Sequence, residues 1–383
     1  MTVLDDFTLN HEYREQALWA PAIVGSATVL PEHRYRQSDL AEVARRRLPD
    51  EMLRDGMIER FFESVQVEER YMALPAERLM TLEGFKDRND LYIELATDLA
   101  ERALRDAFAD ADIEPDEVAM LLTTSVTGIA VPSLDARLMN RLDFDPSLVR
   151  MPLFGLGCLG GAAGIARVAD WLRAYPDKCA VLLAVEICSL AFQFEASVAN
   201  IISYGLFGDG AAAIVLAGAE HPLACRNGTG ARRPRVLGSR SLFFPDTERT
   251  MGWDIDDNGF NVVLGPDVPD IVRANAGPGV DGLLAGHDLV REDVGSWIMH
   301  PGGPKVIDAL EDSLALGRGA LAATREHLRN VGNLSSVSVL FLLDEHRRRH
   351  APGDGSGPYG VLMAMGPAFC AEIVLLRFEG GLS

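Results

Sequence analysis

A faint internal duplication constrains the fold of this 383-residue chain more than any other feature of its sequence. When the second half is moved back by about 175 positions, residues 112–118 match residues 288–294, and each run lies between a predicted helix and a predicted strand. Residues 157–159 and 332–334, each at the start of another long predicted helix, match at the same offset. This repeated order of elements predicts two similar halves related by a pseudo-twofold axis.

A third sequence match and a polar stretch of chain indicate where the two halves are connected. The apolar run 212–216 matches 371–375 at a shorter offset, because the intervening loops differ in length. The polar stretch Asn227–Pro234 lies between the repeats and has the composition of a connection. We therefore expect an N-terminal half over residues 1–230 and a C-terminal half over residues 231–383.

Strand and helix patterns alternate in the first half, which is typical of α/β proteins. Several predicted strands are apolar at nearly every position, so we expect both faces of the sheet to be covered. The predicted strands are Ala22–Leu30, Val118–Ser125, Arg150–Phe154 and Ala180–Ile187, and the predicted helices are Gln37–Leu48, Asn89–Ala109, Leu134–Leu142 and Leu159–Ala174.

Charge and cysteine content exclude several function classes. Acidic residues outnumber basic ones by 56 to 36, and the resulting charge of −20 repels nucleic acid and anionic membranes. No apolar run approaches the roughly 18 residues of a membrane span, and the acidic N-terminus lacks a signal-peptide pattern. The five cysteines show no paired spacing of the kind that binds metals. We expect a cytoplasmic protein without a nucleic-acid partner, a membrane span or a metal site.

Cys158 is the strongest candidate for a nucleophile. It lies in a glycine-rich turn between a predicted strand and a predicted helix. The partial positive charge at a helix N-terminus stabilises a thiolate, so we expect the pKa of this thiol to be lowered. The alternative is a buried, unreactive cysteine, which is common for free cysteines.

The same turn also matches the dinucleotide-binding fingerprint, with glycines at positions 155, 157 and 160. An acid, Glu186, ends the next predicted strand, but it lies further past the first glycine than that fingerprint requires. A dependence on NAD, and hence an oxidoreductase, therefore stays an alternative that rests on the glycines alone.

His300 and Asn333 complete a possible catalytic set. His300 follows a predicted strand that ends at Met299, and Asn333 begins a predicted helix. Alone, each has a structural explanation, as a core histidine or as a helix cap. The duplication, however, predicts that Asn333 lies beside Cys158. A thiol, an imidazole and an amide can together form a nucleophile and stabilise an oxyanion, in a condensing enzyme or in a thioester hydrolase.

Four motifs resemble the chalcone synthase family, the type III polyketide synthases. They are Gly157-Cys158, the run FGDGAA at 207–212, the run WIMHPGGP at 297–304 and the run GNLSS at 332–336, followed by FLLDE at 341–345. The resemblance implies a thiolase-like α/β fold, with two pseudo-equivalent βαβ-type halves in a five-layered arrangement. It also implies a homodimer that uses acyl-CoA and malonyl-CoA, with no cofactor other than these coenzyme A thioesters.

The resemblance also implies a role for each member of the catalytic set. Cys158 resembles the residue that accepts the starter acyl group from coenzyme A. His300 and Asn333 resemble the residues that hold the thioester carbonyl and stabilise the enolate formed when malonyl-CoA loses carbon dioxide. The enolate attacks the acyl group on Cys158, and repeated extension and cyclisation give a ring product.

Residues around the predicted acyl pocket depart from the family pattern. Phe207 resembles the first of two gatekeeper phenylalanines, whereas the second gatekeeper position holds Val262. Together with Cys188 and Ala191, this valine predicts a small, apolar lining with room for an alkyl chain. We therefore expect a medium- or long-chain fatty acyl starter and an alkylpyrone or alkylresorcinol product. An aromatic or malonyl starter is the alternative.

Three further positions are assigned by resemblance alone. Val131 corresponds to the loop that reaches into the partner's cavity. Gly366 belongs to the loop near the C-terminus, which reads AMGPA at 364–368 and has alanines where the family has glycines. Arg60 fills one of the family's basic positions that bind coenzyme A, whereas Met57 and Ser64 replace two others.

Overall fold

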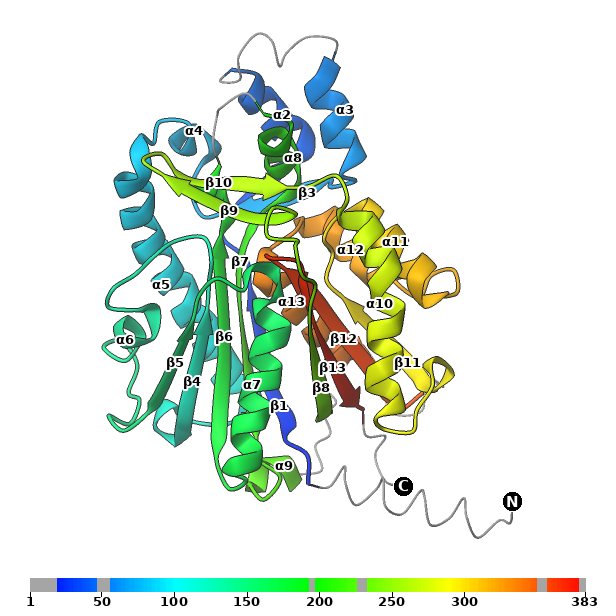
Figure 1. Ribbon diagram of the computed structural model, residues 1–383. Coiled ribbons are helices and arrows are strands. Elements are labelled where there is room, and N and C mark those ends of the chain that lie inside the picture. Colours follow the sequence, from blue (N-terminus) through cyan, green and yellow to red (C-terminus); the bar gives the residue numbers. More distant parts are fainter. Residues whose placement is uncertain (1–18, 47–55, 193–196, 226–232, 350–356, 379–383) are drawn as a thin grey trace.

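A nine-stranded mixed sheet organises the computed structural model, which describes residues 19–46, 56–192, 197–225, 233–349 and 357–378. The strand order is β11-β12-β13-β8-β1-β7-β6-β4-β5 (Figure 1). A single residue pair, Ala22 and Arg235, joins β1 to β8. The sheet therefore consists of two halves that meet at this point. The predicted boundary at residues 230 and 231 lies outside the described residues.

The two halves repeat one topology. In the N-terminal half, β4 and β6 are parallel, and β7 is antiparallel to both β6 and β1. In the C-terminal half, β11 and β12 are parallel, and β13 is antiparallel to both β12 and β8. The strands are β1 (Ala22–Val29), β4 (Val118–Thr124), β5 (Val149–Leu153), β6 (Cys179–Ile187) and β7 (Asp209–Ala217), then β8 (Arg235–Phe243), β11 (Val294–Met299), β12 (Tyr359–Gly366) and β13 (Cys370–Arg377).

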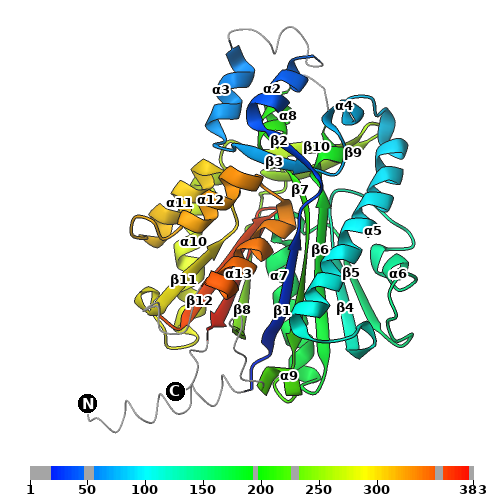
Figure 2. The same cartoon turned by 180° about the vertical axis from the view of Figure 1, so that it is seen from behind.

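Helices cover both faces of each half-sheet (Figures 1 and 2). Alternate residues of β6 and β7 pack outward against α5 and inward against α7 and α13, while those of β12 and β13 pack outward against α10 and α11. The resulting order is outer helix, sheet, central helices, sheet and outer helices, so the predicted five layers are confirmed. The helices are α5 (Gly84–Ala111), α7 (Gly160–Ala174), α10 (Val268–Ala285), α11 (Pro304–Leu314), α12 (Ala322–Val331) and α13 (Ser338–Arg349).

The duplication seen in the sequence is visible in matched backbone details. Asp112 follows α5 and Asp288 follows α10, and both have positive φ angles, of 58° and 50°. Aspartate tolerates this left-handed conformation better than most residues, so both helices end in the same way. A short 3₁₀ turn then leads into β4 and β11, respectively. The paired helices α7 and α13 lie together at the centre of the molecule.

The upper end of the molecule in Figure 1 is built from elements of which the sequence patterns predicted one, the helix expected over Gln37–Leu48. Two small two-stranded sheets and several short helices lie there, above the ends of the central strands. These elements are β2 (His33–Arg36) with β3 (Glu69–Met72), β9 (Met251–Asp256) with β10 (Gly259–Leu264), and the helices α2 (Gln37–Arg45), α3 (Met57–Ser64), α4 (Ala76–Leu79) and α8 (Val198–Leu206). Away from this end, α6 (Leu134–Leu138) lies beside β5, and α9 (Pro222–Cys225) lies beside β1. Among the helices of the described residues, none is both long enough and apolar enough to cross a membrane.

Candidate active site

Cys158 lies where the predicted strand-to-helix turn places it, on the 3₁₀ turn η4 (Gly157–Leu159) at the start of α7. Gly157 has a φ of +54°, and a Cβ at this position would lie 2.4 Å from Cδ of Pro367. Only glycine fits there, so this turn is fixed by close packing. The thiol Sγ lies 3.5 Å from Oγ of Ser335, within hydrogen-bond range for sulfur.

The protonation state of this thiol differs from the sequence prediction. Burial is the largest effect, and it raises the pKa of Cys158 to about 11, while hydrogen bonds from Ser335 and from the backbone act in the opposite direction. The lowered pKa expected from the helix N-terminus is therefore wrong for this site. The physical reason is that burial disfavours the charged thiolate. A nucleophile in this environment needs a base to accept its proton.

His300 is the second member of the predicted catalytic set. It follows β11 directly, and its backbone N–H donates to the carbonyl of Met363 on the neighbouring strand at 2.9 Å. Burial lowers the pKa of His300 to about 3, so the imidazole is neutral at pH 7. A neutral imidazole can accept the thiol proton when a substrate stabilises the resulting ion pair.

Asn333 is held in place by hydrogen bonds of both its side chain and its backbone. Its Oδ1 accepts a hydrogen bond from the backbone N–H of Ser335 at 2.8 Å, which leaves the amide N–H groups as donors. Its own backbone bonds to Leu206 and Gly208, on either side of Phe207, at 2.9 and 3.0 Å. The amide donor and the predicted gatekeeper are therefore fixed to one another.

One cavity of about 570 Å³ brings the predicted catalytic residues together. Its described lining includes Cys158, His300 and Asn333, as well as the predicted pocket residues Phe207, Val262 and Cys188. Ala191 lines a smaller neighbouring pocket. Val131, Gly366 and Arg60 do not line the cavity. Met365 and Pro367, on either side of Gly366, do line it, and Arg60 is exposed on α3.

A buried carboxylate lies behind the catalytic turns. Glu186, at the end of β6, accepts hydrogen bonds from Ser336 at 2.6 Å, Thr127 at 2.9 Å and the backbone N–H of Val126 at 3.1 Å. Burial raises the pKa of Glu186 to about 7. Since this carboxylate is enclosed by protein donors, it cannot contact the ribose of a dinucleotide.

The glycines of the apparent dinucleotide fingerprint also have a different purpose. A Cβ at Gly160 would lie 2.6 Å from Oγ1 of Thr124, and a Cβ at Gly161, the residue after the fingerprint, would lie 2.2 Å from the carbonyl of Ser336. Close packing of the turn and of α7 therefore accounts for these glycines without a bound dinucleotide.

Sequence comparison agrees with this geometry. The N-terminal domain of chalcone and stilbene synthases matches residues 11–221, and the C-terminal domain of the same family matches residues 236–379. The chain belongs to the chalcone and stilbene synthase family. It is a type III polyketide synthase, an acyltransferase whose substrates are coenzyme A thioesters.

Individual relatives of this polyketide synthase cover almost the whole chain. It is 45% identical, over 92% of its length and 91% of the relative, to a 1,3,6,8-tetrahydroxynaphthalene synthase of Streptomyces peucetius subsp. caesius. It is 33% identical to a putative chalcone synthase of Bacillus subtilis, over 94% and 99% of the two chains. The crystal structure of the tetrahydroxynaphthalene synthase of Streptomyces coelicolor superposes with a TM-score of 0.83, at 30% identity, over 94% and 99% of the two chains.

Two lining residues of this polyketide synthase were missed from the sequence. Trp253 lies on β9 directly opposite Val262 on β10 and lines both pockets. Lys305, on the first turn of α11, is the sole Lys, Arg, Asp or Glu among the described residues that line the cavity. The WIMHPGGPK run contains Lys305, so the sequence offered a signal for it. The run DDNG at 256–259 is typical of a tight hairpin turn, so the sequence also offered a signal for the pairing of Trp253 with Val262.

Proposed function

We propose that Cys158 carries the growing chain and that His300 and Asn333 activate both substrates, because all three line a single cavity. The Cys158 thiol transfers its proton to His300 and attacks the starter thioester, which releases coenzyme A. Malonyl-CoA then loses carbon dioxide, and donors from His300 and Asn333 stabilise the enolate oxygen. The enolate carbon attacks the acyl carbonyl, the bond to Cys158 breaks, and a chain longer by two carbons remains on coenzyme A.

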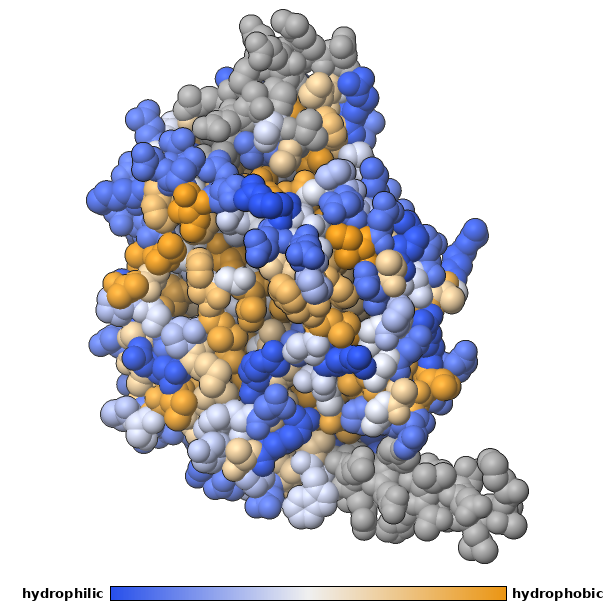
Figure 3. Space-filling model, viewed as in Figure 1, coloured by the Kyte–Doolittle hydropathy of each residue, from blue (hydrophilic) through white to orange (hydrophobic). Residues whose placement is uncertain are grey.

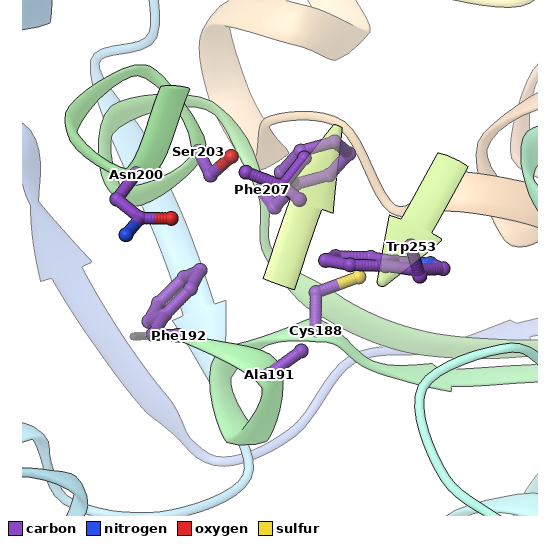
Figure 4. Close-up of a pocket in the computed structure, with 8 residues that line it drawn as sticks. Cys188, Ala191, Phe192, Asn200, Ser203, Phe207 and Trp253 are labelled. Atoms are coloured by element: carbon purple, nitrogen blue, oxygen red, sulfur yellow. The ribbon is translucent and has the colours of Figure 1, made fainter. Parts of the chain in front are cut away.

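The size of the pocket behind Phe207 bears on the choice of starter. Val262 was expected to leave room for an alkyl chain, but the indole of Trp253 occupies the neighbouring space. Figure 4 shows the Cys188 side chain directed towards that indole, with Phe207 beside both. The smaller pocket, which these residues line together with Ala191, has a volume of about 10 Å³, about the space of one water molecule. The same tryptophan and valine also line the 570 Å³ cavity that contains Cys158.

We therefore infer a small starter, with malonyl-CoA serving as both starter and extender, rather than the fatty acyl starter that the sequence favoured. The relative that is 45% identical to this chain is named a 1,3,6,8-tetrahydroxynaphthalene synthase, which supports this inference. A tetrahydroxynaphthalene has a ten-carbon ring skeleton and no alkyl side chain, so its carbon atoms can come entirely from two-carbon units. The product that we propose for this chain is likewise a polyhydroxylated aromatic ring without an alkyl tail.

Incubation of the purified enzyme with labelled malonyl-CoA alone tests the starter. We expect an aromatic product that contains label in every two-carbon unit. Acyl-CoA starters from C4 to C18, added in competition, should enter the product poorly. Preferred incorporation of a long acyl chain would restore the alkyl-pocket hypothesis, and release of free acid without condensation would indicate a hydrolase.

A Trp253 series locates the feature that selects the starter. Trp253→Phe and Trp253→Ala progressively enlarge the pocket behind Phe207. Because each buried methylene contributes about 0.8 kcal/mol, we expect Trp253→Ala to improve kcat/KM for medium-chain starters several-fold per added carbon pair. Val262→Phe serves as the matched control, since it fills space on the paired strand and should exclude alkyl starters further.

We also propose that Lys305 binds an anionic part of the coenzyme A substrate, because it supplies positive charge to an otherwise uncharged lining. The assigned Arg60 lies outside this lining. Lys305→Ala should raise KM for malonyl-CoA about ten-fold with little change in kcat, as expected for loss of a charged hydrogen bond. Arg60→Ala is the control, and an equal rise in KM for that variant would return the role to Arg60.

A homodimer and a cytoplasmic location complete the proposal. Val131 is 89% exposed. Val149, the first residue of the edge strand β5, and Phe154, which follows that strand directly, are exposed as well. Figure 3 shows apolar side chains gathered across the middle of the face that carries β5 and α7. A second copy would cover such a surface. Light scattering should give twice the mass of one chain.

The proposed cytoplasmic location is supported by the cysteines. All five are free thiols, which suits a reducing compartment.

A further inference from the structure

A second buried histidine, His327, lies behind the catalytic histidine. It lies on α12 one turn after Thr324, so both side chains are on the same face of that helix. Oγ1 of Thr324 donates to the carbonyl of Met299 at 3.2 Å. This bond packs that face of α12 against the segment that ends in His300. The ring of His327 also packs edge to face against Phe341, with the ring centroids 5.6 Å apart.

Each of the two histidines has one buried nitrogen without a hydrogen-bond partner among the described residues. These atoms are Nδ1 of His300 and Nε2 of His327. Buried polar atoms are nearly always paired, with protein or with ordered water. The hydrogen bond from Thr324 to Met299 brings this face of α12 against the residue that precedes His300, so both nitrogens lie in one buried region. Two unpaired nitrogens in one buried region are the partners that a bridging water requires.

We propose that His327 is a positioning residue for His300, and that one bound water molecule links Nδ1 of His300 to Nε2 of His327. The water fixes the orientation of the catalytic ring through Nδ1, its buried nitrogen without a partner among the described residues. This inference rests on the proposed roles of Cys158 and His300.

The hydrogen bonds of this link are consistent with the proton transfer at the site. When the Cys158 thiol gives its proton to Nε2 of His300, the resulting imidazolium carries a proton on Nδ1 as well. That N–H donates to the water oxygen, and the water donates to the lone pair on Nε2 of His327. Burial, and secondly His300, lower the pKa of His327 to about 3, so His327 is neutral and its lone pair is available. No other reactant is needed.

The charged groups on the elements around α12 are already engaged elsewhere. On β3, Arg70 donates to the backbone carbonyls of Tyr204 and Phe207. On α11, Asp308 and Glu311 both pair with Arg325. On α13, the ion pairs are Arg347 with Asp110, and Arg348 with both Asp110 and Asp344. His300 is the one titratable side chain whose charge shifts the pKa of His327.

Alkylation of Cys158 by iodoacetamide, measured against pH, tests the link without requiring polyketide formation. Peptide mass spectrometry separates the reaction of Cys158 from that of the other four cysteines. In His327→Leu we expect the midpoint of the alkylation profile to move to higher pH, because the imidazolium loses its acceptor. We expect kcat to fall about ten-fold and KM to stay nearly constant.

Conservative substitutions separate positioning from packing. The side-chain amide of His327→Gln reaches about as far as Nε2 and should restore much of the profile, whereas His327→Asn is too short. His346→Gln, at a buried histidine on α13, is the control and should match the wild type. An unchanged profile in His327→Leu, or equal effects of Leu and Gln, overturns the proposal. If His327→Leu does not fold, identical profiles for His327→Gln and His327→Asn overturn it. Failure of the starter proposal alone leaves these profiles unaffected.

Discussion

The two catalytic turns occupy equivalent places in the two halves but carry different chemistry. The turn η4 leads into α7 and carries the thiol of Cys158. The turn η7 (Ser335–Val337) leads into α13, comes shortly after the amide of Asn333, and is followed by the buried hydroxyl of Ser338. The two regions can pack together because the halves differ at single positions. Gly161 at the start of α7 has no side chain, and this makes room for the carbonyl of Ser336. The duplication therefore determines where reactive groups lie, and differences at single positions determine which groups they are.

Removing the thiol from the N-terminal turn should have the largest effect. We expect Cys158→Ala to abolish starter loading and product formation, because Cys158 is the proposed carrier of the acyl chain. Mass spectrometry of the intact protein after incubation with labelled substrate measures loading. Cys225→Ala, at an exposed cysteine, is the control and should load normally. Product formation by purified Cys158→Ala would contradict the assignment.

Removing the amide donor from the C-terminal turn should cost less. We expect Asn333→Ala to lower the rate of carbon dioxide release from malonyl-CoA about 100- to 1000-fold, the usual effect of losing one oxyanion donor. Because Oδ1 of Asn333 also holds the N–H of Ser335, Asn333→Asp is a sharper test. It keeps that acceptor and removes the donors. Wild-type carbon dioxide release in Asn333→Asp would show that the amide holds only the turn.

The sequence predicted the duplicated parts of the molecule better than the unique parts. Residues 112–118 and 288–294 were recognised as equivalents, and Cys158 and Asn333 were expected to be neighbours, because a repeat relates positions without any knowledge of contacts. The burial of Cys158 was not predictable from its position at a helix start, since it depends on residues far away in sequence. Trp253, the strand partner of Val262, was missed because the β9–β10 hairpin was not among the predicted strands.

The burial of Glu186, whose carboxylate accepts a hydrogen bond from Ser336 of the other half, should make stability depend on pH. Burial is the largest effect on Glu186, and it raises the pKa of this carboxyl in the folded protein from its ordinary value of 4.5 to about 7. Between these values the folded state binds more protons than the unfolded state, so the free energy of unfolding falls as pH rises. The difference corresponds to a loss of about 3 kcal/mol, complete above the folded pKa.

Substitution of this carboxyl isolates its contribution. In Glu186→Gln the amide can donate to Ser336 and still accept from Thr127, so we expect the fall in stability between pH 4.5 and 7 to be smaller than in the wild type. Urea unfolding at a series of pH values measures the difference. Asp209, whose pKa burial raises to about 6, contributes a similar fall that both proteins share. Parallel pH curves for the two proteins would show that Glu186 does not titrate in this range.

The smallest effect is expected in the loop by which the C-terminal half contacts the N-terminal turn. Pro367 packs against Gly157, and the next residue, Ala368, has a φ of +54°. A left-handed conformation costs an alanine about 1–2 kcal/mol, while the greater freedom of glycine in the unfolded chain costs about 0.5–1 kcal/mol. Ala368→Gly should therefore raise the free energy of unfolding by about 0.5–1 kcal/mol, measured by urea unfolding. Ala315→Gly, at a φ of +52°, should have the same sign, whereas Ala364→Gly, within β12, should destabilise. A loss of stability in Ala368→Gly would show that the Cβ of Ala368 makes contacts worth more than its backbone strain.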